Sequence, residues 1–189
     1  MSQRPRIYLA GPEVFLPDAL AVGQAKVVLC AAHGCEGAFP LDASLDLTGL
    51  EKHEQATRIS TANEGLMRTC DALIANLTPF RGVSMDSGTA FEVGFMRALG
   101  RPVLGYSNIA GDYKGRADAY RALQIGLTDA DAPDVEVEDF GLAENLMIAA
   151  AIMQSGGTVV SRAVPAGQEI RDLAGFEACV LQVRRVLGV

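Results

Sequence analysis

Short runs of apolar residues alternate along this chain with longer segments in which apolar residues recur at helical spacing. The short runs predict five strands, at residues 6–10, 37–40, 72–77, 102–107 and 158–161. The longer segments predict five helices, at residues 18–32, 53–70, 88–99, 142–154 and 168–187. Such alternation is typical of βαβ units joined by right-handed crossovers. We therefore expect an α/β protein with a doubly wound parallel sheet of about five strands and helices on both faces.

The chain is long enough for one domain with a full core. Its 189 residues fit this size, and we expect residues 1–189 to form a single domain. Residues 109–135 depart from the alternation, because they are polar and rich in Gly, Asp and Ala. We interpret this stretch as an excursion or lid and not as a second domain.

Charge and composition exclude several kinds of partner. The net charge of −7, with basic residues scattered along the chain, argues against a nucleic-acid groove. No apolar run is long enough to span a bilayer, and the N-terminal residues enter a strand without a signal-peptide core. Metal-ligand spacing is absent among the cysteines and histidines: Cys30, Cys35, Cys70, Cys179, His33 and His53. We expect a cytoplasmic protein with free thiols and with no metal, cofactor, nucleic-acid or membrane partner.

One carboxylate lies on the apolar face of a predicted helix. Glu92 shares this face with its i+3, i+4 and i+7 neighbours, Phe95, Met96 and Leu99. A carboxylate in that place must be paired, protonated or functional, because desolvating an unpaired charge costs too much free energy. The structural alternative is a buried glutamate capped by a tyrosine hydroxyl or by backbone amides.

In open parallel sheets, ligands bind beyond the carboxyl ends of the strands. This rule gathers residues that follow three different strands at one edge: Tyr8, Gly11, Asp42, Ser44 and the loop at residues 77–86. Asp71 begins a strand, so we place it at the opposite rim and interpret it as structural.

Five segments in order resemble the nucleoside 2-deoxyribosyltransferase family: YLAGPEVF, PLD, CDALIANLTPFRG, DSGTAFEVGFMRALGRPV and EDFGLAENLMI. The most specific spacing is Asp-x5-Glu-x-Gly, which begins at Asp86 and contains Glu92. The resemblance implies a flavodoxin-like sheet and a glutamate nucleophile. It implies that this nucleophile attacks the anomeric carbon of a 2′-deoxynucleoside, and that a free nucleobase then takes up the sugar.

The resemblance assigns Glu92 as the nucleophile, and the chemistry suits a carboxylate. Cleavage of an N-glycosidic bond passes through an oxocarbenium-like transition state, which a nearby carboxylate stabilises and can trap covalently. Tyr8 is the candidate donor of a hydrogen bond that keeps this carboxylate ionised. The alternative for Tyr8 is a half-buried aromatic residue at a strand end.

Asp86 lies in the turn that enters the Glu92 helix. It is either a helix N-cap or a partner of the sugar 5′-hydroxyl, and both roles are compatible. Relatives that hydrolyse deoxynucleoside 5′-monophosphates place Ser here, so a carboxylate favours nucleosides. Nearby Arg81, Ser84 and Ser87 keep the nucleotide alternative open.

Two glycines of the same motifs are candidate substrate contacts. Gly88 can let the backbone approach the sugar and present an amide at a helix N-terminus, or it serves turn geometry alone. Gly11, at the end of the first strand, is a further candidate.

Base recognition is where the chain departs from the family pattern. The family places an acid at the position of Asn63 and often Gln at the position of Ser44. Asn63 can donate and accept hydrogen bonds but cannot act as a general acid. Asp42 is a possible substitute, or a turn residue.

The resemblance also implies self-association with shared active sites, at least as a dimer. Asn145 and Met147 occupy the segment that enters a neighbouring subunit's site in the family. Without that role, Met147 is helix core and Asn145 a solvent-facing residue.

Three functions remain at this point: deoxyribosyl transfer between nucleobases, hydrolysis of 2′-deoxynucleosides or their 5′-monophosphates by the same glutamate, and non-catalytic sensing of a nucleoside or nucleotide. Binding alone does not require a nucleophile, so the set of Glu92, Tyr8 and Asp86 argues against the sensor.

Overall fold

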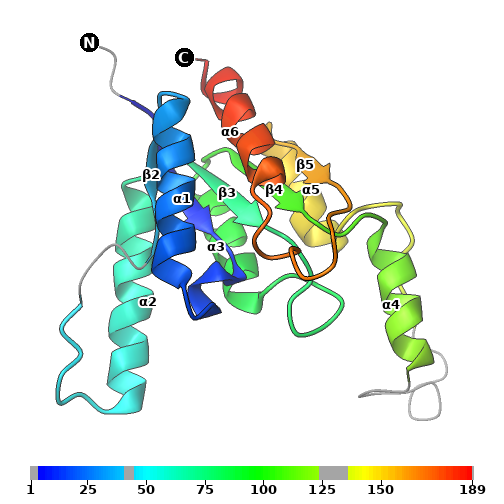
Figure 1. The fold of residues 1–189 in the computed structure, drawn as a ribbon, viewed down its shortest axis with the longest axis horizontal. Helices are drawn as coiled ribbons and strands as arrows, with labels where there is room; N and C mark the ends of the chain where they lie inside the picture. Colours follow the sequence, from blue (N-terminus) through cyan, green and yellow to red (C-terminus); the bar gives the residue numbers. More distant parts are fainter. Residues whose placement is uncertain (1–3, 41–44, 124–135, 189) are drawn as a thin grey trace.

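A parallel sheet forms the centre of the molecule (Figure 1). The structure, a computed structural model, describes residues 4–40, 45–123 and 136–188. Within these residues the strands are β1 (Arg6–Ala10), β2 (Glu36–Ala38), β3 (Ala72–Asn76), β4 (Val103–Ser107) and β5 (Val159–Ser161). They are all parallel and lie in the order β2-β1-β3-β4-β5. This order is the flavodoxin-like one, as predicted, and its topological switch point lies between β1 and β3.

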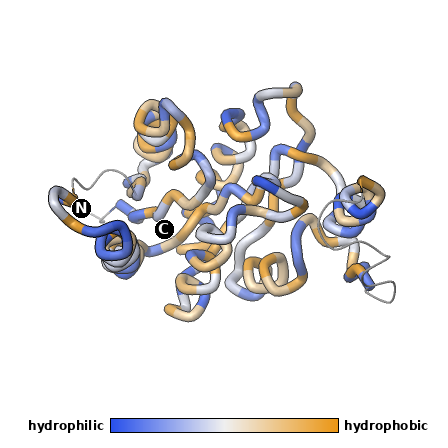
Figure 2. The backbone as a smooth tube through the Cα atoms, turned by 90° about the horizontal axis from the view of Figure 1, so that it is seen from below, coloured by the Kyte–Doolittle hydropathy of each residue, from blue (hydrophilic) through white to orange (hydrophobic). Residues whose placement is uncertain are grey.

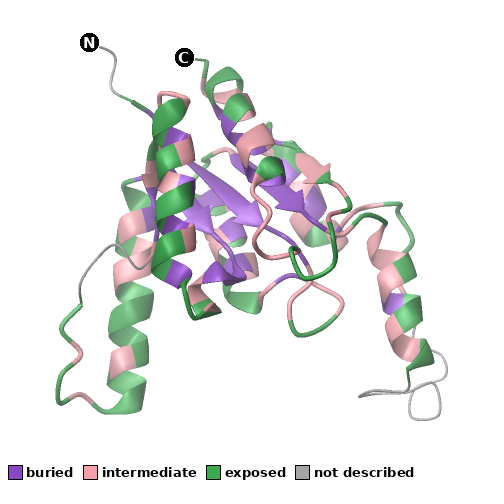
Figure 3. Ribbon diagram, viewed as in Figure 1, coloured by how far each residue is buried: buried purple, intermediate pink, exposed green. Residues whose placement is uncertain are grey.

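Helices cover both faces of the sheet (Figure 1). A short 3-10 helix follows β1, and the elements are η1 (Pro12–Phe15), α1 (Ala19–Ala32), α2 (Lys52–Arg68), α3 (Ser87–Ala98), α4 (Tyr113–Ala122), α5 (Leu146–Gln154) and α6 (Ala174–Leu187). The helices α1 and α6 pack together on one face, and α3 and α5 pack together on the other. Most of α2 is hydrophilic (Figure 2) and exposed (Figure 3). No helix among the described residues is long and apolar enough to cross a membrane.

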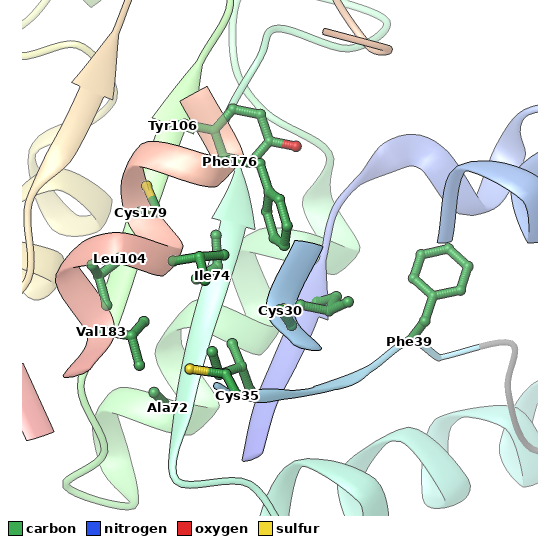
Figure 4. Close-up of a cluster of buried hydrophobic side chains, with 13 residues drawn as sticks. Cys30, Cys35, Phe39, Ala72, Ile74, Leu104, Tyr106, Phe176, Cys179 and Val183 are labelled. Atoms are coloured by element: carbon green, nitrogen blue, oxygen red, sulfur yellow. The ribbon is translucent and has the colours of Figure 1, made fainter. Parts of the chain in front are cut away.

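The two faces bury separate apolar cores. Figure 4 shows the core between the sheet and helices α1 and α6, in which Ile74, Tyr106 and Phe176 are fully buried. The core on the other face contains Tyr8 and Met96. The central strands are almost fully buried (Figure 3), which is expected where helices cover both faces of a parallel sheet.

Several element boundaries differ from the predicted ones. The helix predicted from residue 142 begins at Leu146, because the side chain of Asn145 caps it by accepting a hydrogen bond from the Met147 amide. The last helix begins at Ala174 and not at residue 168. The second strand is Glu36–Ala38 and not residues 37–40.

The polar stretch at residues 109–135 contains a helix that the sequence pattern did not predict. Asp112 caps α4 by accepting a hydrogen bond from the Gly115 amide at 2.8 Å. Residues 124–135 of this stretch lie outside the described residues. At the opposite rim, Asp71 accepts a hydrogen bond from the Arg6 amide at 2.8 Å and joins the starts of β3 and β1. This position agrees with the structural role predicted for it.

Candidate active site

A cavity of ≈ 390 Å³ lies beyond the carboxyl end of β1, at the switch point of the sheet. Its lining comes from the turn after β1, from α2, from the loop before α2 and from the first turns of α3. Five of the predicted site residues line the cavity: Gly11, Asn63, Asp86, Gly88 and Glu92. The fold therefore brings together residues that are up to 81 positions apart in the chain, as the edge rule predicted.

Glu92 and Tyr8 are in direct contact. The Tyr8 hydroxyl donates a hydrogen bond to Glu92 Oε1 at 2.5 Å, from β1 to α3. Burial raises the pKa of Glu92 to about 7, the hydrogen bond from Tyr8 opposes this rise, and the charge of Asp86 adds to it. Burial and the charge of Glu92 raise the pKa of Tyr8, so the phenol stays protonated and remains a donor. The pair thus holds one carboxylate oxygen and leaves Oε2 free to act at the cavity wall.

Asp86 serves as the N-cap of α3. Its Oδ2 accepts hydrogen bonds from the Thr89 amide at 3.0 Å and from Thr89 Oγ1 at 3.2 Å. Both contacts use Oδ2, so Oδ1 is available to a ligand in the cavity that Asp86 lines. A Cβ at Gly88 would lie 3.0 Å from Asp86 Oδ2, so a side chain there would press on the cap.

Gly11 is required by close packing under the cavity. A Cβ at this position would lie 2.0 Å from Glu13 Oε2 and 2.9 Å from Asn76 Cβ. No side chain fits that space, which explains a glycine at the end of β1.

The far wall of the cavity is apolar. Leu45, Leu47 and Ile59 line it, together with Phe15 from η1. Asn63, in α2, also lines the cavity beside these apolar residues, and its carboxamide makes no hydrogen bond with the described residues. A planar ligand bound against this wall would have apolar side chains against its faces and the Asn63 carboxamide available to its edge.

Four predicted site residues are not brought to this cavity by the described chain. Asp42 and Ser44 lie outside the described residues. The amide of Asn145 is engaged elsewhere, since its Nδ2 donates to Glu138 Oε2 at 3.1 Å and its Oδ1 caps α5. Met147 is 70% exposed, so the alternative of a helix-core residue is wrong for it.

A second carboxylate cluster lies on the other face of the sheet and was missed by the sequence analysis. Glu13 is fully buried, and its Oε1 accepts hydrogen bonds from Lys26 Nζ, from Asn76 Nδ2 at 2.9 Å and from the Tyr106 hydroxyl at 2.9 Å. The available signal was a lysine inside the apolar helix α1, at the face that contacts the sheet.

An aromatic group with a cation lies beside the cavity. Phe15, which lines the cavity, stacks on Phe80 with ring centroids 5.5 Å apart. The Arg81 guanidinium carbon lies 4.8 Å from the Phe15 centroid and 4.6 Å from that of Phe80. Arg81 adopts a left-handed backbone with φ of 58°, which is uncommon for a residue with a side chain.

A carboxylate held by a tyrosine at the wall of a cavity, at the switch point of a parallel α/β sheet, is typical of an enzyme site that binds a small molecule. Among the described residues, no group of three or more His, Cys, Asp or Glu is arranged to hold a metal ion.

Comparison with known proteins specifies this class further. The profile of the family described as nucleoside 2-deoxyribosyltransferase matches residues 7–147. A 2-desoxiribosyltransferase from Leishmania mexicana is 33% identical, with a TM-score of 0.59 over 76% of this chain and 85% of its own. An uncharacterized protein of Schizosaccharomyces pombe is 33% identical over 172 residues, which cover 82% of this chain and 80% of that protein. A conserved protein from Enterococcus faecalis, at 21% identity, shares the fold with a TM-score of 0.56 over 95% of this chain and 99% of its own.

The chain therefore belongs to the nucleoside 2-deoxyribosyltransferase family, as the motifs predicted. Membership indicates an enzyme that acts on nucleosides and nucleobases, either a deoxyribosyltransferase or a relative of one.

Proposed function

We propose that this protein transfers 2-deoxyribose between nucleobases through a covalent sugar ester on Glu92. The observation that carries the proposal is the contact of 2.5 Å between the Tyr8 hydroxyl and Glu92 Oε1 at the cavity wall. It leaves the other carboxylate oxygen of Glu92, a residue of the cavity lining, without a hydrogen bond to the described residues.

In the first step, Glu92 Oε2 attacks the anomeric carbon of a 2′-deoxynucleoside. A C–O ester bond forms, the N-glycosidic bond breaks, and its electron pair leaves with the base nitrogen, which takes up a proton from solvent. In the second step, a nitrogen of the acceptor base attacks the same carbon, loses its proton, and releases the Glu92 carboxylate. The carboxylate stabilises the oxocarbenium-like charge in both transition states.

Two neighbouring residues support this chemistry. Tyr8 donates a hydrogen bond to Glu92 Oε1 and favours the ionised nucleophile, because this bond opposes the rise in the pKa of Glu92 caused by burial. Asp86 Oδ1 accepts a hydrogen bond from the sugar 5′-hydroxyl, while Oδ2 keeps the helix cap. Gly11 and Gly88 keep the cavity wall open to the sugar.

Asn63 contacts the edge of the base. Its carboxamide lies free in an otherwise apolar wall, and it can donate and accept hydrogen bonds. Asp42 stays a further prediction for this edge.

A second candidate function is hydrolysis of deoxynucleoside 5′-monophosphates with water as the acceptor. The specific observation in its favour is the Arg81 guanidinium, which lies over Phe15 beside the cavity. The Ser84 hydroxyl does not add to this case, because it donates to Glu144 Oε1 at 2.6 Å. The carboxylate of Asp86 opposes a phosphate by repulsion.

One experiment separates these functions. The protein is incubated with thymidine, deoxyadenosine or their 5′-monophosphates, with and without a second free base, and products are identified by chromatography. We expect a new deoxynucleoside that forms only when the acceptor base is present. Release of free base at the same rate with and without acceptor would establish a hydrolase, and no turnover of any of the four compounds would overturn both proposals.

We further propose that a second subunit completes the site with Asn145 and Met147. The 70% exposure of Met147 supports this, and two further apolar residues of the same stretch of chain, Phe140 and Met153, are 65% and 51% exposed. Burying such side chains contributes about 25 cal/mol per Å².

Complementation tests the shared site. Glu92→Ala and Asn145→Ala proteins should each be inactive or nearly so. Mixing them under conditions of subunit exchange should restore activity, because some sites then hold both intact residues. A protein that sediments as an active monomer at assay concentration would contradict the shared site.

A further inference from the structure

The helix α4, in the polar stretch after β4, contributes one side chain that reaches far beyond its own segment. Arg116 donates from Nε to the Val83 carbonyl at 3.0 Å and from Nη2 to the Ala143 carbonyl at 2.7 Å. Its Nη1 also donates to the Asp112 carbonyl at 3.2 Å, which fixes the guanidinium against the start of its own helix. The side chain is only 13% exposed. Arg116 thus joins the loop before α3 to the segment before α5.

A fully buried carboxylate completes this junction. Glu144 Oε1 accepts hydrogen bonds from Ser84 Oγ at 2.6 Å and from the Asn145 amide at 2.9 Å. Glu144 Oε2 accepts from the Met85 amide at 3.1 Å and lies 3.6 Å from Arg116 Nη2. Both oxygens are therefore engaged by the chain, and the charge is balanced by the guanidinium, so this carboxylate is not a free acid for chemistry.

The contacts end directly before Asp86. Val83, Ser84 and Met85 are held in succession by Arg116 and Glu144, and the next residue is the N-cap whose carboxylate lines the cavity. This loop has no regular secondary structure over residues 77–86. Each ordered residue of such a segment costs about 1–2 kcal/mol of conformational entropy, so its position depends on side-chain contacts.

We propose that Arg116 and Glu144 are positioning residues for the sugar end of the active site, and that α4 acts as a buttress for Asp86. This inference rests on the proposed function and deepens it, because it assigns a role to the polar stretch that the sequence predicted to be an excursion or lid. The same pair also fixes the amide of Asn145, so it sets the Asp86 loop and the segment proposed for a second subunit relative to each other.

A truncated substrate separates positioning from general stability. A 2′,5′-dideoxynucleoside lacks the 5′-hydroxyl with which Asp86 is proposed to pair, so an error in the position of Asp86 does not affect its turnover. Arg116→Lys and Ser84→Ala are the variants, and Lys114→Ala is the control. Lys114 lies on the same helix and pairs only with Asp118 at 2.5 Å on the surface.

The measured quantity is kcat/KM for the 2′-deoxynucleoside and for the 2′,5′-dideoxynucleoside with the same base. We expect Arg116→Lys to lower kcat/KM on the full substrate by about 10–100-fold, since misplacement by about 1 Å has effects of this size. The loss on the truncated substrate should be under about threefold, and Lys114→Ala should match the wild type on both. Ser84→Ala should show the same pattern with a smaller loss. Because it removes only one hydroxyl, it can replace Arg116→Lys in the test if that variant fails to fold.

Equal losses on both substrates in Arg116→Lys and Ser84→Ala would overturn the inference and leave a purely structural role. A double variant provides a second criterion: in Asp86→Ala protein, Ser84→Ala should have no further effect on the full substrate. A wild-type protein that does not act on 2′-deoxynucleosides would instead refute the proposed function, so the two failures are distinguishable.

Discussion

The carboxyl end of β1 is flanked by a tyrosine–glutamate pair on each face of the sheet. On one face, Tyr106 donates to Glu13 at 2.9 Å, and Lys26 and Asn76 also donate to the same oxygen. On the other face, Tyr8 alone donates to Glu92, at 2.5 Å. Glu13 is fully buried, whereas Glu92 lines a cavity of ≈ 390 Å³. The residue types are the same, and the surroundings differ.

The difference distinguishes a structural carboxylate, Glu13, from the proposed nucleophile, Glu92. A buried charge with an ammonium and two further donors is compensated, and it joins α1 to the ends of β3 and β4. One oxygen of Glu13 also lacks a hydrogen bond, so the difference lies in the cation and in the number of donors. Among the described residues Glu92 has one donor and no ion-pair partner, so it keeps part of its desolvation cost, and burial dominates its pKa. Groups in this second situation are the ones expected at active sites.

The largest expected effect is the loss of activity on removal of Glu92, the proposed nucleophile. Glu92→Ala should lower kcat for both transfer and hydrolysis by about 10⁴-fold or more, since the nucleophile is lost. The fold should survive, because no ion pair is broken. Mass spectrometry of wild-type protein with a deoxynucleoside and no acceptor should show a sugar adduct on Glu92. More than a tenth of wild-type activity in the variant would remove Glu92 from the role of nucleophile.

Changes at the buried Glu13–Lys26 pair should affect stability more than activity. Lys26→Met leaves Glu13 as a buried, uncompensated charge and should lower the free energy of unfolding by about 3–5 kcal/mol, measured by urea denaturation.

A paired variant serves as its control. Adding Glu13→Gln to Lys26→Met should recover much of the loss, because the uncompensated charge is gone. Specific activity per folded molecule should change far less than in Glu92→Ala. If Lys26→Met were as stable as the wild type, the buried pair would not hold this part of the fold.

The pH dependence sharpens the contrast further. With a pKa of about 7, Glu92 is ionised mainly above neutrality, so kcat should fall about tenfold per pH unit below about pH 7. Tyr8→Phe removes the hydrogen bond that lowers this pKa, so the midpoint should move to higher pH. A profile that stays flat down to pH 5 in the wild type would be incompatible with a carboxylate nucleophile of raised pKa.

The same shift has a consequence for stability, with a definite sign. The folded pKa of Glu92 lies above its ordinary value of 4.5, so the folded state binds the proton more tightly. Its contribution to stability is therefore lost as pH rises from about 4.5 through about 7. Glu92→Gln should be more stable than the wild type above pH 7, by thermal or urea unfolding, and should lose this advantage in acid.

Local patterns predicted the sheet and one side of the site. Apolar runs located the strands, and the edge rule gathered Tyr8, Gly11 and Asp86 because parallel strands end at one edge. The apolar face predicted for α3 was right for Met96, which is fully buried, but Leu99 at the helix end is 38% exposed. The spacing of apolar residues predicts which side of the helix faces the sheet. It does not predict at which residue along the helix the sheet ceases to cover that side.

Long-range polar contacts were beyond the reach of the sequence. Glu13 and Lys26 are 13 residues apart, and Tyr106 joins them across 93 residues. Arg116 and Glu144 meet only because α4 returns the chain to the loop before α3. Charged residues in polar stretches usually face solvent, so their pattern does not distinguish a buried hub from a solvated helix.

The smallest expected effect concerns Asp86, which caps α3 and is proposed to bind the 5′-hydroxyl of the sugar. The wild type should prefer deoxynucleosides to their 5′-monophosphates in kcat/KM, because Asp86 repels a phosphate. Asp86→Ser should narrow or reverse this preference by roughly tenfold, a change of about 1.4 kcal/mol. Serine is also a good N-cap, so α3 should keep its start, and an unchanged unfolding midpoint would verify this. Asp86→Asn, which keeps the cap and removes only the charge, should reproduce the gain on monophosphates. Equal kcat/KM of the wild type on thymidine and its monophosphate would show that the Asp86 carboxylate does not face the 5′ end of the substrate.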